Sequence, residues 1–234
     1  MIKRGFSFIF DHNWIAILYF NFRMLPFKQA IKLPFDFYHS IKFENLGGQV
    51  AISSTSPLKR GMIKIGAQGS DMFNRECTSL DLRGNLLVGN AVTIGTGTVI
   101  RIEENGSLEI GNSVAIGARS MLFCENSMII KEGTITSWNC QMMDTDTHSI
   151  EDVNSLEVYP RSKPIFIGKR CWIGNHVLIN KGTVFPDDLI VASNSLCNKD
   201  YSKTISPFSI IGGIPAGLIS ENKRIFGDKI NKNA

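Results

Sequence analysis

Apolar side chains recur every six residues along much of this chain, and that period restricts its possible folds more than any other feature. The longest run with an unbroken period comprises Ile167, Ile173, Ile179, Phe185, Val191 and Cys197. A period of six matches neither the 3.6-residue repeat of an α-helix nor the two-residue alternation of a strand. It indicates short strands joined by turns, with one side chain of each repeat pointing into a shared core.

Three shorter runs with the same period precede the long one. They comprise Val88, Ile94 and Ile100; Ile110, Ile116 and Leu122; and Ile130, Thr136 and Met142. Small shifts of register separate these runs, and glycine follows several of the aliphatic positions, where it relieves crowding in a turn. Coils built in this way stack, with backbone hydrogen bonds between successive coils about 4.8 Å apart. We therefore expect an all-β solenoid.

The repeat over residues 86–217 resembles that of the hexapeptide-repeat acyltransferases. Within that family the similarity points to the maltose and galactoside O-acetyltransferases and to surface-polysaccharide O-acetyltransferases. Residues 210–217 are similar to the family's closing signature, although Gly213-Ile214 replaces the usual Gly-Asn. The resemblance implies a left-handed parallel β-helix and a homotrimer with active sites between subunits. The left-handed sense comes from the resemblance alone, because parallel crossovers are right-handed by default.

The sequence divides into three parts. We expect residues 1–85 to form an N-terminal cap region and the segment that leads into the β-helix. Residues 86–217 are expected to form the β-helix itself, a prism of stacked coils with an excursion loop at 149–164, and residues 218–234 a C-terminal tail. Residues 1–45 hold nine of the 15 phenylalanines, and six Lys or Arg against three acidic residues. One interpretation is a cap over the first coil, because an open coil leaves an unpaired sheet edge. The other is a peripheral membrane contact through an aromatic and basic surface.

The six-residue period breaks directly after the string Asp144-Thr145-Asp146-Thr147-His148. Loops that leave a rigid scaffold often carry catalytic groups, and this Asp-x-Asp-x-His string is similar to the family's catalytic segment. We expect His148 to act as a general base, because an imidazole can take the proton of a hydroxyl group that attacks a thioester. Asp146, Asp144 or a backbone carbonyl would hold the other ring N–H. The alternative interpretation is a solvated histidine beside an Asp-capped turn.

The segment after the loop supplies the candidate residues for cofactor binding. The string Trp172-Ile173-Gly174-Asn175 resembles a family element, which implies that Trp172 and Asn175 flank the pantetheine groove of acetyl-CoA and that a nearby backbone N–H stabilises the thioester oxygen. Ser193 and Lys199 fall in a segment that resembles the lining of the CoA channel. One interpretation is that Lys199 approaches a phosphate of CoA. The other is that Lys199 is a solvated surface lysine. Weaker candidates for the nucleotide end are Lys203, Lys223 and Arg224.

Composition and missing motifs argue against several other functions. A net charge of +4, dispersed along the chain, does not predict a nucleic-acid-binding face. Five cysteines without CxxC spacing indicate neither a disulfide framework nor a zinc site, which favours a reducing cytoplasm. A γ-class carbonic anhydrase needs three histidines for zinc, and the coils contain His148 and His176, of which His176 is interpreted as a surface or packing residue. Residues 1–85 lack the glycine-rich pattern of a nucleotidyltransferase.

These features predict an acetyl-CoA-dependent O-acetyltransferase that acts on a sugar hydroxyl and needs no metal. Residues 19–27 also resemble the leader of acyltransferases encoded with bacterial surface-polysaccharide genes, which narrows the acceptor to a sugar or glycan of capsule or O-antigen biosynthesis. The alternatives are an N-acetyltransferase that acts on an amino-sugar nucleotide and a non-catalytic β-helix binding scaffold. No stretch reaches the roughly 18 to 20 apolar residues of a membrane-spanning helix. We expect a cytoplasmic protein, or a peripheral one at the inner face of the membrane.

Overall fold

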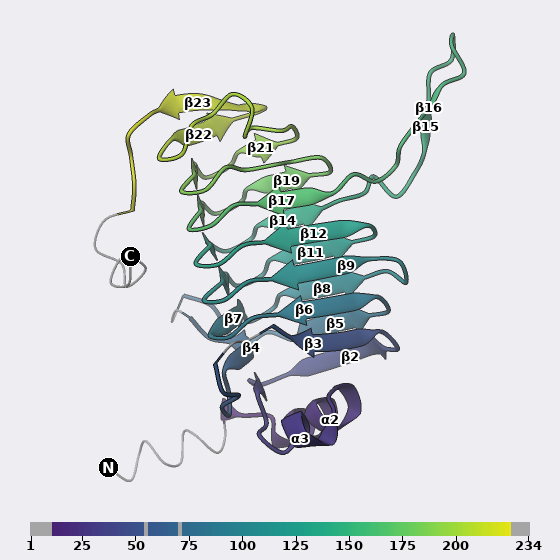
Figure 1. Cartoon of the computed structure of the whole chain (residues 1–234), viewed down its shortest axis with the longest axis vertical. Coiled ribbons are helices and arrows are strands. Elements are labelled where there is room, and N and C mark those ends of the chain that lie inside the picture. The colour runs from purple at the N-terminus through teal and green to yellow at the C-terminus, as the bar shows by residue number, and fades with distance from the viewer. Residues whose placement is uncertain (1–10, 54–55, 70–71, 226–234) are drawn as a thin grey trace.

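The computed structural model describes residues 11–53, 56–69 and 72–225. In these residues, short strands wind into coils that stack along one axis (Figure 1). The coils build three sheets that form the faces of a prism, and their strands are parallel except at the last strand pair of one sheet. The all-β solenoid predicted from the six-residue period is confirmed. The expectations for residues 1–10 and 226–234, which include part of the cap and the end of the tail, lie outside the described residues.

Each sheet of the prism runs along the stacking axis, and neighbouring strands within it are hydrogen-bonded. In spatial order, sheet 1 contains β1 (Phe35–Phe37), β4 (Ile63–Ala67), β7 (Val92–Gly95), β10 (Ala115–Ile116), β13 (Ile135–Thr136), β18 (Trp172–Ile173), β20 (Ile190–Val191), β22 (Ile210–Gly213) and β23 (Ala216–Ser220). Sheet 2 contains β2 (Ile41–Leu46), β5 (Thr78–Leu82), β8 (Val99–Ile102), β11 (Met121–Cys124), β14 (Gln141–Met143), β19 (Leu178–Asn180) and β21 (Leu196–Cys197). Sheet 3 contains β17 (Ile165–Ile167), β12 (Ser127–Ile130), β9 (Ser107–Ile110), β6 (Asn85–Val88) and β3 (Gln49–Ile52). A separate antiparallel hairpin pairs β15 (Ile150–Glu151) with β16 (Val158–Tyr159), and the helices α2 (Trp14–Met24) and α3 (Phe27–Ala30) precede β1.

The periodic side chains form ladders inside the prism. In sheet 2, parallel register stacks Leu80, Ile100, Leu122, Met142, Ile179 and Cys197 on one another. Every residue of the four periodic runs is at most 3% exposed. Burying one such aliphatic side chain contributes roughly 1.5–3 kcal/mol, so the ladders stabilise the whole stack and hold its coils in register.

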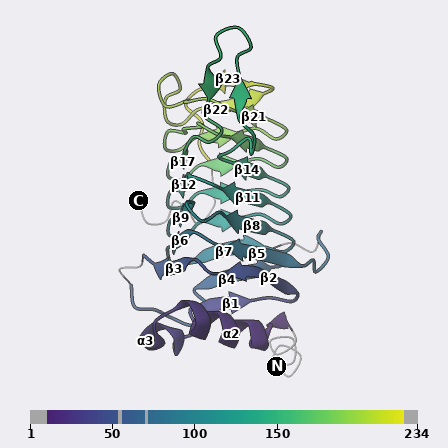
Figure 2. The same cartoon turned by 90° about the vertical axis from the view of Figure 1, so that its right-hand side faces the viewer.

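The helices α2 and α3 cover the first coil at the N-terminal end (Figures 1 and 2). The Asn13 side chain caps α2 by accepting the backbone N–H of Ala16 at 3.0 Å. Phe20 packs against Phe35 of β1 with ring centroids 4.9 Å apart. The buried amide of Asn21 donates to the Phe35 carbonyl at 2.8 Å and accepts the Phe35 N–H at 3.1 Å. The helix is therefore tied to the first strand by packing and by hydrogen bonds.

The coils start before residue 86, where the period becomes visible in the sequence. The strands β1, β2 and β3 pair in parallel with β4, β5 and β6, so they belong to the same stack. Long connections interrupt this part of the chain, for example residues 53–62 between β3 and β4 and residues 68–77 between β4 and β5. Because these connections differ in length, they shift the register and hide the six-residue spacing.

Candidate active site

Between β6 and β21, departures from the six-residue period gather at one corner of the prism, where sheet 2 passes into sheet 3. Residues 103–106 follow β8, residues 125–126 follow β11 and residues 144–164 follow β14. We call these three segments the bulged corner. Across the same corner one coil later, Ile179 and Phe185 keep the six-residue spacing. Because the insertions lie in successive coils, they form one continuous surface.

The longest insertion forms an arm that projects from the prism (Figures 1 and 2). The strands β15 and β16 make its outer part. At its base, Thr145 forms an antiparallel bridge with Ser162, and the backbone N–H of Asp146 donates to the Arg161 carbonyl at 2.8 Å. These contacts hold the two sides of the arm base together directly before His148.

Asp144 is buried and supports the turn beneath the arm. Its carboxylate accepts the backbone N–H groups of Glu125 at 2.8 Å, Asn126 at 2.9 Å and Ser127 at 2.8 Å. Burial raises the pKa of Asp144, while the three N–H donors act in the opposite direction because they stabilise the carboxylate. Asp144 therefore fixes the turn between β11 and β12, and it makes no hydrogen bond to His148 in the described subunit.

Asp146 ties the arm to the next coil. The Lys181 ammonium lies 2.5 Å from the Asp146 carboxylate and donates to the Pro160 carbonyl at 2.7 Å, so it joins both sides of the arm. A second tie is the ion pair between Glu125 and Arg161, with a distance of 2.5 Å. In the described subunit, the side chain of Asp146 thus holds the loop and has no hydrogen bond to the imidazole of His148.

His148 is exposed at the base of the arm. Among the described residues, its ring has no hydrogen-bond or ion-pair partner. The backbone on its N-terminal side is fixed by the arm base, while the ring itself is accessible. This combination suits a side chain that contacts a ligand or a second subunit.

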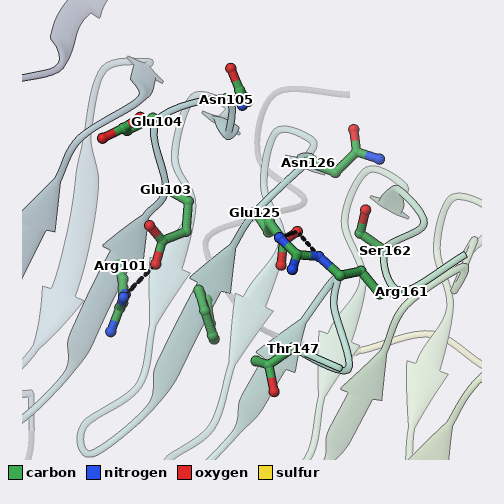
Figure 3. A pocket seen from close by; sticks show the side chains of 10 residues that line it. Arg101, Glu103, Glu104, Asn105, Glu125, Asn126, Thr147, Arg161 and Ser162 are labelled. Atoms are coloured by element: carbon green, nitrogen blue, oxygen red, sulfur yellow. Dashed lines mark hydrogen bonds and ion pairs between the residues drawn. The ribbon is translucent and has the colours of Figure 1, made fainter. Parts of the chain in front are cut away.

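A cleft of about 640 Å³ opens beside the base of the arm (Figure 3). It is lined by Arg101, Glu103, Glu104, Asn105, Phe123, Glu125, Asn126, Thr147, Arg161 and Ser162. Nearly all of these residues belong to the bulged corner. Thr147 lines the cleft and directly precedes the exposed His148 in the chain.

Two pairs of opposite charge stand in the cleft. Arg101 and Glu103 approach to 2.5 Å, as do Arg161 and Glu125 (Figure 3). The Arg101 guanidinium also lies 5.2 Å from the centroid of the Phe123 ring. Carboxylates and side-chain amides accept hydrogen bonds, guanidinium groups donate them, and the ring offers an apolar surface. Such a lining suits a ligand rich in hydroxyl groups.

A polar network occupies the corner between sheet 1 and sheet 2. The Ser193 hydroxyl donates to Asn175 Oδ1 at 2.6 Å, and Asn175 Nδ2 lies 2.9 Å from His176 Nδ1. On the other side of the ring, Asn139 Nδ2 lies 3.1 Å from His176 Nε2. The structure thus brings together Asn175 and Ser193, two of the predicted cofactor residues, and adds His176 to them.

The remaining predicted cofactor residues, Trp172 and Lys199, are not members of this hydrogen-bonded network. Trp172 is 41% exposed on the outer face of sheet 1. Lys199 follows β21, on the side of the prism that carries the bulged corner, and its Nζ lies 5.3 Å from the centroid of the Tyr201 ring. The weaker candidates Lys203, Lys223 and Arg224 are all exposed.

Two kinds of feature are absent within residues 11–53, 56–69 and 72–225. In these residues, no group of three or more His, Cys, Asp or Glu side chains is placed to hold a metal ion. No helix in the same ranges is long and apolar enough to cross a membrane.

Comparison with protein-family profiles gives no match for this chain. Two curated proteins match over short stretches. The galactoside O-acetyltransferase of Escherichia coli (strain K12) is 38% identical over 60 residues, which cover 26% of this chain and 28% of that protein. The chloramphenicol acetyltransferase of Morganella morganii is 34% identical over 76 residues, which cover 32% of this chain and 33% of that protein. The chain thus spans about a third or less of the length of these relatives.

A solved structure matches over most of the chain. The polySia-specific acetyltransferase NeuO superposes with a TM-score of 0.59 and 16% sequence identity, covering 84% of this chain and 80% of NeuO. The chain is a left-handed β-helix of the hexapeptide-repeat type. The resemblance to hexapeptide-repeat acetyltransferases predicted from the sequence is confirmed, and so is the handedness that it implied.

The β-helix presents candidate residues that the periodic pattern did not single out. The cleft residues Glu103 and Glu125 carry no motif, but they mark positions where the period fails. Ile110 follows Ile100 by ten positions and Ile130 follows Leu122 by eight, in place of six, so each longer step locates an insertion at the bulged corner. His176 had no comparable signal, because its network depends on a contact with a residue of the previous coil.

Proposed function

We propose that this β-helix transfers an acetyl group from acetyl-CoA to a sugar hydroxyl, with His148 as the general base. The observation that carries the proposal is the position of His148, which is exposed at the base of the arm and directly follows Thr147, a residue that lines the polar cleft. The similarity to a galactoside O-acetyltransferase and a chloramphenicol acetyltransferase supports acetyl transfer as the reaction. We further propose that the acceptor belongs to a surface polysaccharide.

The proposed reaction requires one base close to the acceptor hydroxyl. A ring nitrogen of His148 takes the hydroxyl proton while the oxygen attacks the thioester carbon, the carbon–sulfur bond breaks, and the departing thiolate takes the proton from the imidazolium. A base of this kind contributes typically 10²–10⁴-fold to a rate. Because Asp144 and Asp146 are engaged with the loop itself, we propose that they position the arm. The hydrogen bond that orients the imidazole then comes from another group.

The cleft is the proposed acceptor site. Its guanidinium groups and amides would donate to sugar oxygens, and Glu103 and Glu125 would accept from sugar hydroxyls. The ring of Phe123 would pack against the C–H face of a sugar. In this arrangement the hydroxyl to be acetylated points toward His148, past the neighbouring Thr147.

The acetyl donor is proposed to bind along the corner that holds Asn175 and Ser193. This corner is where the chain enters sheet 2, whereas His148 follows the end of β14, where the chain leaves sheet 2. The two groups therefore lie at opposite ends of the strands of sheet 2 within one subunit. A site that contains both needs two subunits, which supports a homotrimer with active sites between neighbours.

The arm itself also favours a neighbouring subunit. Its exposed apolar residues include Val153 at 85%, Leu156 at 69% and Val158 at 58% exposure. An isolated two-stranded hairpin is only marginally stable in water, so these side chains favour a packed environment. We propose that the arm packs on the next subunit of the trimer.

The proposal is tested by incubating the purified protein with acetyl-CoA and a panel of hydroxyl and amino sugars, free and nucleotide-linked, and by reading the product mass and the free thiol of CoA. We expect an acetyl group on oxygen. Acetylation on nitrogen alone would favour the amino-sugar nucleotide alternative. If a trimer of correct mass consumes no acetyl-CoA with any acceptor, the protein is a binding scaffold and the proposal is wrong.

A further inference from the structure

The helix α2 is apolar on its outer side as well as on its buried side. Ile15 is 83% exposed, Leu18 49%, Tyr19 52% and Phe22 48%. With 3.6 residues per turn, these positions form a single stripe along the helix. A helix that is apolar all round is normally buried on all sides. The outer stripe of α2 has no such cover within the described subunit.

The apolar stripe continues onto α3 and the residue after it. Phe27 is 72% exposed and Ile31 is 54% exposed, one helical turn apart. The rings of Phe22 and Phe27 lie 6.1 Å apart, so the two helices share one surface. We call this surface the cap surface, and it consists of Ile15, Leu18, Tyr19, Phe22, Phe27 and Ile31. Exposed apolar patches that are contiguous mark interaction sites more often than isolated apolar residues do.

The charged residues next in sequence to the cap surface all have one sign. Arg23, Lys28 and Lys32 are exposed and lie next in sequence to Phe22, Phe27 and Ile31 respectively. Between residues 12 and 35 the sequence contains no Asp or Glu. In a two-fold contact with a second copy, the same patch would face itself and bring these cations together. The charge pattern instead complements an extended anionic surface.

We propose that the cap surface docks on an anionic lipid bilayer. Aromatic and aliphatic side chains would enter the interface between headgroups and acyl chains, while the three cations contact anionic headgroups. Because the cap surface faces away from the first coil, docking would stand the prism on its N-terminal end. Four coil spacings of about 4.8 Å separate β2 from β14, so the arm would lie well above the membrane. This inference goes beyond acetyl transfer and does not depend on it.

The test is co-sedimentation of the full-length protein with large vesicles of phosphatidylcholine alone or with a third of phosphatidylglycerol. We expect binding to the anionic vesicles that weakens at high salt. Neutralising the three cations with Arg23→Gln, Lys28→Gln and Lys32→Gln should weaken binding by roughly a hundredfold. An apolar variant with Phe22→Ser and Phe27→Ser should weaken it by at least about tenfold.

A matched control carries Leu218→Ser and Ile219→Ser, which alter exposed apolar residues at the opposite end of the prism, and it should bind as the wild type does. Circular dichroism and oligomeric mass show that each variant is folded. The proposal is overturned if the full-length protein sediments no more with anionic vesicles than without vesicles. Binding that appears only after removal of residues 1–10 would identify that segment as the occupant. A cap variant that changes only the oligomeric mass would identify a second copy.

Discussion

Replacing Asp144 by alanine should destabilise the protein far more than replacing Asp146. The Asp144 side chain is fully buried, and its carboxylate accepts three backbone N–H groups at 2.8 to 2.9 Å. Each hydrogen bond to a charged acceptor contributes about 1.5–3 kcal/mol, and the cost of burying the charge offsets part of this. By analogy with the loss of one partner of a buried pair, we expect a net loss of about 3–5 kcal/mol for Asp144→Ala.

Asp146→Ala removes an ion pair with Lys181 at a partly exposed site, which is worth at most about 1 kcal/mol. Urea unfolding at a fixed protein concentration, followed by tryptophan fluorescence, measures both changes. Catalysis should also distinguish these aspartates from residues that orient His148. Because Asp144 positions the arm, Asp144→Asn should lower kcat without shifting the acid limb of a plot of kcat/KM against pH. A loss below about 1 kcal/mol for Asp144→Ala, or an equal loss for both variants, would refute this reasoning.

Three further predictions concern the prism. Gly117→Ala should destabilise the protein by more than about 2 kcal/mol in urea unfolding, because an added Cβ would lie 2.2 Å from a backbone oxygen of the next coil. Gly217→Ala is the control and should change stability little, because a Cβ at that position would have no neighbouring atom within 4 Å. Ile179→Ala should cost about 2–5 kcal/mol in the same assay, since it opens a cavity in the sheet 2 ladder; a loss smaller than about 1 kcal/mol would contradict the ladder. Burial raises the pKa of the Cys140 thiol to about 11, so Ellman's reagent at pH 8 should modify the exposed Cys77 and spare Cys140 until the protein unfolds.

The periodic part of the fold was predictable because each coil repeats the same physical requirement. Nearly every inward position is apolar and recurs at the same spacing from corner to corner. The spacing of residues such as Ile173 and Ile179 therefore predicts the prism before any contact is known. The coils before residue 86 obey the same rule, but connections of unequal length conceal it. Handedness needed the resemblance, because spacing is the same for both hands.

The candidate site was predictable only where sequence order and spatial order agree. The break in the period directly after His148 placed that residue at the base of a loop. The roles of Asp144 and Asp146 could not be read from their spacing, because their partners come from neighbouring coils. The cleft joins insertions of successive coils, and the network around His176 joins corner residues of three successive coils. Contacts of this kind follow from stacking, which no local motif encodes.

The most direct test of the central claim is the turnover number of His148→Gln with acetyl-CoA and the best sugar acceptor. Glutamine preserves size and polarity but takes no proton at neutral pH, so kcat should fall by about 10²–10⁴-fold while the KM for acetyl-CoA stays nearly constant. His39→Asn provides the control, because it removes a histidine of the first coil, far along the chain from the arm. Asparagine tolerates the left-handed φ of 57° at this position. This variant should keep most of the wild-type kcat. A His148→Gln variant that keeps roughly a tenth or more of the wild-type kcat would contradict the assignment of His148 as the base.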